Sequence, residues 1–280
     1  MAEITIGIPT YNRPAGLRQA LESIEKQSLQ PDKIIVSDNA STTTETEKIA
    51  AEFADKLPIQ YFRQKENLGA KRNFIFLLEQ ADTKYFMWLA DDDAFGADDT
   101  LLHLYQEIRL HQNVVMTFPD VDVFFDEEKT HYSRGIHSKI FGNCQTNWDY
   151  LRAFAGYGGG HCFYGLYDRK MLESFNLDSV FDSSIAYFNE GVFLHTLFLN
   201  GGIRFVPKAK FTYNGTSPAK ISSEILLHSF QIYSEKVLNL YSERKLKFFQ
   251  NLIVMRELRK SHSPYIRSLE RDIKATKDMK

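Results

Sequence analysis

The sequence predicts an α/β protein with a Rossmann-like, mostly parallel central sheet, flanked by helices and followed by a C-terminal helical extension. Two observations predict this fold. Between residues 3 and 118, short apolar runs alternate with segments whose apolar residues recur at helical spacing, an alternation typical of a parallel sheet covered on both faces. From Ser222 onward, apolar residues recur every three to four positions, which predicts long helices.

The expected strands are the apolar runs 3–9, 33–38, 59–64, 84–91 and 113–118. Between them we expect helices over 13–27 and 44–55, then one that carries Phe74, Leu77, Leu78 and Ala81 on one face, and one that aligns Leu101, Leu104, Tyr105 and Ile108. The chain is less regular from 119 to 213, and the segment Ser261 to Pro264 is expected to interrupt the C-terminal helices. We therefore expect one domain over 1–215, with halves 1–118 and 119–215, and an extension over 216–280.

The composition is that of an ordinary soluble globular protein. The chain has 280 residues, of which 43% are hydrophobic and 25% charged, and its net charge of −2 gives no support to nucleic-acid binding. Cys144 and Cys162 have neither a metal-binding spacing nor a disulfide pattern. The N-terminus does not resemble a signal peptide, and the apolar run 248–255 is too short to span a bilayer. These features predict a cytoplasmic protein that does not span the membrane.

Polar clusters follow four of the expected strands. They read PTYNR, SDNAS, QKENLGAKRN and DDD, in chain order. In open parallel sheets, ligands bind beyond the carboxyl ends of the strands. The clusters therefore predict one site at a single edge of the sheet.

Three adjacent acids, Asp91, Asp92 and Asp93, end the fourth expected strand. Neighbouring carboxylates repel one another, so a positive partner is expected. Carboxylate oxygens suit a hard divalent cation such as Mg²⁺ or Mn²⁺, with phosphate oxygens of a substrate completing its shell. The alternative is a solvated acidic turn, the role we expect for Asp98 and Asp99 before the next helix.

Two other clusters suggest nucleotide contacts. Asp38 follows an apolar strand, where its carboxylate could accept a hydrogen bond from a nucleobase, or could cap a turn instead. Lys71 and Arg72 lie at the expected start of a helix, just after Gly69. A helix N-terminus with two cations predicts an anion site, and the alternative is a pair of solvated surface bases.

The segments IGIPTYNRP, IIVSDNAS, ENLGAKRN and WLADDD, in this order and spacing, resemble the donor-binding half of GT-A fold, family 2 glycosyltransferases. The resemblance is strong over 3–118 and continues more loosely to Tyr213. It implies a nucleotide-sugar-binding half over 1–118 and an acceptor-binding half over 119–215. It also implies Mn²⁺ or Mg²⁺ at Asp93 and a UDP-sugar as the donor. The donor-binding residues implied by the resemblance are Pro9, Thr10, Tyr11, Arg13, Asp38, Asn67, Arg72, Asp91 and Asp92.

Inverting members of this family carry a general base in an acidic pair at the start of a later helix. Asn189-Glu190 aligns with that pair, so the resemblance assigns the base to Glu190. The chain departs from the usual Glu-Asp here, and the alternative is an acid that simply favours a helix N-terminus. The aromatic, Gly-rich stretch around His161 and Tyr164 suggests weak acceptor contacts, although a lone histidine is more often structural.

The resemblance implies a metal-dependent, inverting transfer to a hydroxyl of a glycan or lipid-linked saccharide, in the synthesis of bacterial surface polysaccharide or glycan. Lys and Arg outnumber Asp and Glu after Arg244, so the C-terminal helices could contact the inner face of the cell membrane. A solvated pair of helices or a homo-oligomer interface is the alternative. Two other functions stay open: a nucleotidyltransferase, although no Gly-rich phosphate loop follows the first strand, and a non-catalytic nucleotide-sugar-binding scaffold, which the Asn189-Glu190 departure favours.

Overall fold

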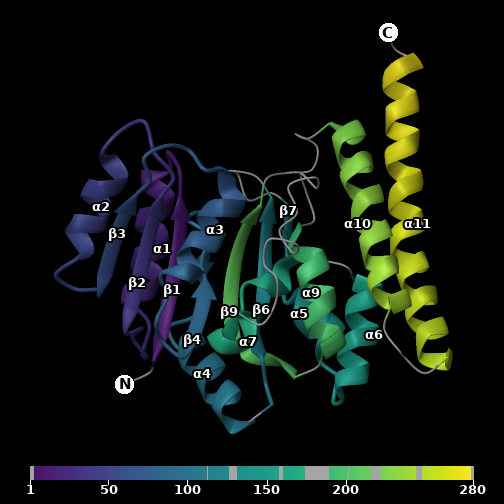
Figure 1. The fold of residues 1–280 in the computed structure, drawn as a ribbon, viewed down its shortest axis with the longest axis horizontal. Helices are drawn as coiled ribbons and strands as arrows, with labels where there is room; N and C mark the ends of the chain where they lie inside the picture. Colours follow the sequence, from purple (N-terminus) through teal and green to yellow (C-terminus); the bar gives the residue numbers. More distant parts are fainter. Residues whose placement is uncertain are drawn as a thin grey trace. The chain divides into compact units, whose positions relative to one another are not determined.

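A computed structural model describes residues 3–111, 113–125, 131–157, 160–173, 189–200, 202–215, 222–243 and 248–278. Over these residues one sheet has the strand order β3-β2-β1-β4-β8-β6-β9-β5, and β7 pairs with β6. Its strands are β1 (Ile4–Thr10), β2 (Lys33–Asp38), β3 (Ile59–Arg63), β4 (Tyr85–Trp88), β5 (Ala94–Phe95), β6 (Met116–Phe125), β7 (His131–Ser133), β8 (Leu166–Asp168) and β9 (Ile203–Gly215). Figure 1 labels all of these strands except β5 and β8.

The strands β1 to β4 run parallel to one another, and β9 runs parallel to β6. The short strand β8 is antiparallel to both β4 and β6, and β5 is antiparallel to β9. Every residue of β1 is buried, as expected for a strand covered on both faces. The predicted α/β fold with a mostly parallel sheet is confirmed.

Helices α1 (Pro14–Glu25), α2 (Glu45–Phe53), α3 (Gly69–Glu79) and α4 (Thr100–Leu110) connect these strands in the predicted order. α1 forms because its apolar residues share one face that packs into the core: Leu17, Ala20, Leu21 and Ile24 are all fully buried. Pro14 lies in its first turn, where proline is tolerated. Three shorter elements follow: α5 (Ile136–Phe141), the 3₁₀ turn η1 (Gly160–Phe163) and α7 (Arg169–Glu173).

The expectation that the last strand closes at Phe118 is wrong. β6 continues through Pro119 to Phe125, and its register against β9 shifts between Pro119 and Asp120. Proline has no N–H to donate to a ladder, so an irregularity at this position lets the strand continue. The region after Pro119 therefore contributes part of the sheet.

The chain divides into two compact units. One consists of residues 1–139, 161–177 and 203–215, and contains the whole sheet. The other consists of 140–160, 178–202 and 216–280, and contains α6 (Asn147–Tyr157), α9 (Asn189–Asn200), α10 (Ser223–Glu243) and α11 (Phe248–Asp278). Within this second unit α6 packs against α9 and α11, and α10 packs against α9 and α11. The domain boundary at 215 and 216 stays a prediction.

The C-terminal helices are present as predicted, but the interruption at Ser261 to Pro264 is wrong. The stripe Leu226, Phe230, Tyr233, Val237 and Tyr241 is buried on α10, whereas α11 continues through Pro264 without a break. Burial of Val254, Leu258, His262 and Leu269 along α11 offsets the backbone hydrogen bond that a proline removes. None of the helices in the described ranges is long and apolar enough to cross a membrane.

Candidate active site

The loops after β1 and β2 are tied together at the carboxyl edge of the sheet. Asn12 and Ala40 both adopt positive φ angles, 56° and 61°, which turn the chain sharply after each strand. The Asn12 backbone N–H donates to Ser41 Oγ at 2.8 Å, and Asn12 Oδ1 accepts from the Thr42 N–H at 2.8 Å. Pro9 and Thr10 end β1, and Tyr11 follows with 42% of its surface exposed.

Asp38 lies at this edge, but its carboxylate is fully buried and hydrogen-bonded. Oδ1 accepts from the Ser41 N–H at 2.7 Å, and Oδ2 accepts from Thr46 Oγ1 at 2.7 Å and from the Tyr61 hydroxyl at 2.5 Å. Burial acts to raise the pKa of Asp38, but these hydrogen bonds outweigh it and lower the pKa. In this structure Asp38 builds the loop, and its contact with a nucleobase stays a prediction.

The loop before α3 carries Asn67. Its Oδ1 accepts from Asn39 Nδ2 at 2.9 Å and from the Gly69 N–H at 2.8 Å. α3 begins at Gly69, next to the predicted start, and the φ of 79° at this residue favours glycine. Arg72 is exposed and pairs with Glu79 further along the same helix, with Nη1 and Oε1 3.3 Å apart. An exposed pair of this kind is weak, so Arg72 can still turn to a phosphate, and that role stays a prediction.

Arg13 is the positive partner of two of the three aspartates, Asp91 and Asp92. Its Nη1 lies 3.2 Å from Asp91 Oδ1 and 2.5 Å from Asp92 Oδ2. Asp91 is buried whereas Asp92 is half exposed. Burial raises the pKa of Asp91 to about 6, although the nearby Thr10 hydroxyl and the charge of Arg13 act against the rise.

Asp93 is buried and is held by Asn214 of β9, the strand that pairs with β5 directly after Asp93. The Asn214 N–H at the end of β9 donates to Asp93 Oδ1 at 2.8 Å, and Asn214 Nδ2 donates to the Asp92 carbonyl at 2.6 Å. Burial raises the pKa of Asp93 well above its usual value, and the charge of Asp92 adds to the rise. The Asn214 N–H and the nearby Tyr164 hydroxyl act on this pKa in the opposite direction.

Three buried oxygens at this edge lack a hydrogen-bond partner among the described residues: Thr10 Oγ1, Asp91 Oδ2 and Asp93 Oδ2. Buried polar atoms are normally paired, and these three make no hydrogen bond of normal length to the described residues, so they are available to a ligand. The described ranges hold no group of three His, Cys, Asp or Glu side chains that would form a protein-made metal cage. The residues therefore fit a hard divalent cation that takes one or two carboxylates and draws its other ligands from a substrate.

The predicted acceptor residues lie in the same unit as the aspartates. The His161 ring contacts Tyr213 edge to face, with centroids 4.7 Å apart, and burial lowers the pKa of His161 to about 4. The Tyr164 ring stacks on Phe211 at 5.0 Å and approaches Tyr213 at 5.9 Å. His161 is therefore neutral at physiological pH, and acceptor contacts by both residues stay predictions.

Glu190 belongs to the other unit and lies in the first turn of α9. Its carboxylate rests against Gly160, where an added Cβ would lie only 2.6 Å from Glu190 Oε1. Burial raises the pKa of Glu190, although its side chain keeps some exposure. A carboxylate with a raised pKa at a partly exposed helix start suits a general base, and that role stays a prediction.

Sequence reasoning missed two asparagines that organise the site, Asn39 and Asn214, whereas it expected Asn12 to contact the donor and did not expect it to tie two loops together. Asn12 and Asn39 lie inside the clusters PTYNR and SDNAS, and Asn in a loop after a strand is a known signal for positive φ and side-chain-to-backbone bonding. Asn214 is 121 residues from Asp93 in sequence, so only the folded sheet brings the two together.

Comparisons with known proteins show the family of the chain. The sequence profile of Glycosyl transferase family 2 matches residues 5–174. The abequosyltransferase RfbV of Salmonella typhimurium is 39% identical over 99 residues, which is 34% of this chain and 29% of that protein. The GalNAc(5)-diNAcBac-PP-undecaprenol beta-1,3-glucosyltransferase of Campylobacter jejuni is 32% identical over 114 residues, 40% of this chain and 37% of that protein. The matches thus span well under half of these relatives.

Solved structures share the fold at low sequence identity. The structure of S. aureus TarS 1–349 in complex with UDP-GlcNAc has a TM-score of 0.68 and 19% identity, covering 93% of this chain and 72% of that one. The mannosyltransferase PcManGT of Pyrobaculum calidifontis, in complex with GDP-Man and Mn²⁺, has a TM-score of 0.63 and 15% identity, covering 99% and 75%. With the profile matching more than half of its residues, the chain belongs to glycosyl transferase family 2.

Proposed function

We propose that this protein is a glycosyltransferase that moves a sugar from a nucleoside diphosphate donor, most simply a UDP-sugar, to a hydroxyl of a glycan or lipid-linked acceptor. The observation that carries the proposal is the set of buried, unpartnered oxygens of Thr10, Asp91 and Asp93 at the strand ends. Family membership supports the reaction class. A UDP-GlcNAc complex of TarS supports the donor class, and the undecaprenol-linked substrate named for the Campylobacter relative supports the acceptor class.

The donor end of the mechanism follows from charge. A nucleoside diphosphate leaving group gathers negative charge on its phosphate oxygens, which a bound Mg²⁺ or Mn²⁺ offsets. Asp93 and Asp91 would hold this ion through their unpartnered Oδ2 atoms. Arg13 screens Asp91 and Asp92 from each other, and Arg72 supplies a second cation at the start of α3. Asn12, Asn39 and Asn67 hold the loops at this edge in place, and these loops form the nucleotide-binding site.

The acceptor end needs a base. In an inverting transfer, Glu190 takes the proton of the acceptor hydroxyl as that oxygen attacks the anomeric carbon, which passes through an oxocarbenium-like state. The partial burial that raises the pKa of Glu190 strengthens it as a base at neutral pH. A well-placed general base contributes about 10²–10⁴-fold to the rate.

The decisive experiment incubates the protein with a panel of nucleotide sugars and Mn²⁺ and measures released nucleoside diphosphate. We expect release with one donor, loss of most turnover in Glu190→Gln with donor binding retained, and weaker Mn²⁺-dependent donor binding in Asp93→Asn by calorimetry. Binding of a nucleotide sugar without release, for any acceptor offered, would favour the non-catalytic scaffold instead. Release of pyrophosphate from a nucleoside triphosphate would indicate a nucleotidyltransferase.

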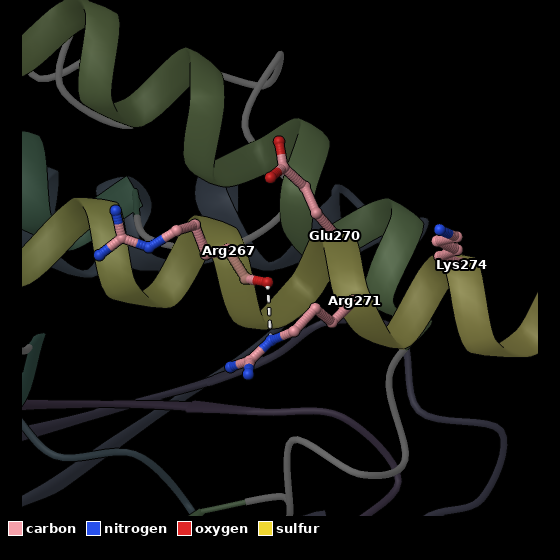
Figure 2. A pocket seen from close by; sticks show the side chains of 4 residues that line it. All are labelled: Arg267, Glu270, Arg271 and Lys274. Carbon is pink, nitrogen blue, oxygen red and sulfur yellow. Dashed lines mark hydrogen bonds between the residues drawn. The ribbon is translucent and has the colours of Figure 1, made fainter.

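We also propose peripheral contact with an anionic membrane surface through α11. Arg267, Arg271 and Lys274, with Glu270, line a shallow hollow of about 530 Å³ on this helix (Figure 2). The Arg271 Nε donates to the Arg267 carbonyl at 3.3 Å. Both arginines are exposed on the helix. Exposed Arg and Lys are attracted to anionic lipid headgroups, and such a surface would hold a lipid-linked acceptor near the enzyme. A cytoplasmic location and a homo-oligomer remain predictions.

A further inference from the structure

A buried polar cluster in the second unit joins α10 to the helix that carries Glu190. His195 of α9 is fully buried, and both of its ring nitrogens contact tyrosine hydroxyls of α10. Nδ1 lies 2.9 Å from the Tyr241 hydroxyl and Nε2 lies 3.0 Å from the Tyr233 hydroxyl. Burial lowers the pKa of His195 to about 3, so the ring is neutral and donates to one tyrosine while it accepts from the other.

Tyr233 also packs directly against the backbone next to Glu190. A Cβ added to Gly191 would lie 2.7 Å from Tyr233 Cε2 and 3.3 Å from Cζ, so the ring occupies the space that a side chain at 191 would need. Gly191 and His195 are four residues apart and share one face of α9. Tyr233 therefore spans one helical turn, with its ring on Gly191 and its hydroxyl on His195.

Glu190 also interacts electrostatically with Tyr233. Burial raises the pKa of Tyr233, and the neighbouring Glu190 carboxylate raises it further. The Glu190 carboxylate also rests on Gly160. The first turn of α9 thus makes two close contacts, one from the Glu190 side chain to Gly160 and one from Gly191 to the Tyr233 ring.

We propose that Tyr233, held by His195, is a positioning residue that sets where the Glu190 carboxylate lies. This inference rests on the proposed function, because it assumes that Glu190 is the general base. It gives the C-terminal helix α10 a part in catalysis. A base displaced by about 1 Å can lose about 10²-fold in rate, so the packing of one ring on one glycine is sufficient to matter.

The test compares variants at Tyr233 with a control on the same helix. Tyr233→Leu removes the ring from Gly191, and we expect kcat to fall by about tenfold or more while the Kd for the nucleoside diphosphate stays unchanged. Tyr233→Phe keeps the ring and loses only the hydroxyl, so it should recover part of that loss. Ser234→Ala is the control. Like Tyr233→Phe, it removes one buried hydrogen bond of α10, here the one between Ser234 Oγ and His262 Nδ1 of α11, which are 3.2 Å apart. This variant should leave kcat unchanged. If Tyr233→Leu does not fold, Gly191→Ala tests the same contact, because its Cβ would lie 2.7 Å from Tyr233 Cε2, and the same fall in kcat with an unchanged Kd is expected.

A double-mutant cycle separates positioning from general destabilisation. Because Tyr233 acts through Glu190, Tyr233→Leu should cause no further loss in the Glu190→Gln background. The same fold-loss in both backgrounds, or a kcat loss in Ser234→Ala equal to that in Tyr233→Phe, would overturn the inference and leave the proposed base intact. Full turnover in Glu190→Gln alone would instead remove the base assignment and the inference with it.

Discussion

At the scale of single residues, Gly160 limits the position of the proposed base. An alanine there would place its Cβ 2.6 Å from Glu190 Oε1 and 2.7 Å from Glu190 Cγ. Both distances are shorter than the contacts that Cβ atoms make in proteins, so the Glu190 side chain would have to move. We expect Gly160→Ala to lower kcat by about tenfold or more, since a small displacement of a catalytic group is costly. Steady-state kinetics and calorimetry with the nucleoside diphosphate would show lost turnover and retained binding.

A neighbouring glycine supplies the control for this change. At Gly156, in α6, the nearest atom to an added Cβ is Glu257 Oε2 at 4.0 Å, an ordinary contact. Gly156→Ala should leave kcat unchanged and stabilise the helix by about 0.5–1 kcal/mol. Equal kinetic losses in both variants would show that the effect does not pass through Glu190.

The buried carboxyl of Asp91 makes stability depend on pH. Its pKa is about 6 in the fold, against about 3.9 in an unfolded chain, so as pH rises the unfolded chain releases this proton first. Ionisation of Asp91 in the folded protein therefore costs stability progressively between about pH 4 and 6. The amide of Asp91→Asn does not ionise, so this variant is not destabilised as pH rises. The difference in unfolding free energy between Asp91→Asn and the wild type should therefore increase by about 2 kcal/mol in favour of the variant from pH 4 to 7. Urea denaturation at several pH values measures it, and a constant difference would contradict the shift.

The sequence predicted the acidic trio and its location, because apolar strands that end in acids place carboxylates at one edge of a parallel sheet. It did not predict that Arg13, expected to contact the donor, pairs with both Asp91 and Asp92. That pairing depends on β1 and β4 being neighbours in the sheet, which no local pattern encodes. For the same reason Asn214 was missed.

At the scale of elements, the buried pair Ser37 and Asn73 fastens α3 to β2. Asn73 Nδ2 donates to the Ser37 carbonyl at 2.9 Å, and Ser37 Oγ donates to Asn73 Oδ1 at 2.5 Å. Asn73→Ala leaves buried polar groups unpaired, and we expect a loss of about 2–4 kcal/mol in the free energy of unfolding. Urea denaturation would measure this loss. Asn200→Ala, at an exposed helical asparagine, should change stability by less than about 0.5 kcal/mol, and a similar loss in both variants would show that burial is not the cause.

Most elements were predictable because their periodicity is local. The stripe of α10, from Leu226 to Tyr241, follows from residue spacing alone and is buried as expected. The two failures involve proline. Pro119 and Pro264 predict breaks by local rules, yet β6 continues with a register shift and α11 continues because its neighbours pack against it. Tertiary packing overrode the local signal at both positions.

At the scale of the whole molecule, the proposed membrane contact through α11 can be tested by charge reversal. Arg267→Glu with Arg271→Glu changes two exposed cations of the hollow in Figure 2. Each basic residue near an anionic surface contributes about 1 kcal/mol to binding, so we expect the double variant to lose co-sedimentation with phosphatidylserine-containing vesicles. Binding should also weaken with added salt.

A second double variant controls for net charge. Lys48→Glu with Lys56→Glu makes the same change at exposed lysines of the sheet-containing unit. This variant should bind vesicles as the wild type does. Equal loss in both variants would mean that total charge, and not α11, governs binding, and no binding by the wild type would end the membrane proposal.

The pairing of β6 with β9 also has a consequence for biosynthesis. β6 ends at Phe125 and its parallel neighbour begins at Ile203, so a nascent chain exposes one edge of β6 until the ribosome has made the intervening residues. At ordinary translation speeds this takes on the order of 10 s. During that interval the hydrogen bond from the Asn214 N–H to Asp93 is also missing. The proposed donor site at the strand ends is therefore complete only when residue 214 has emerged.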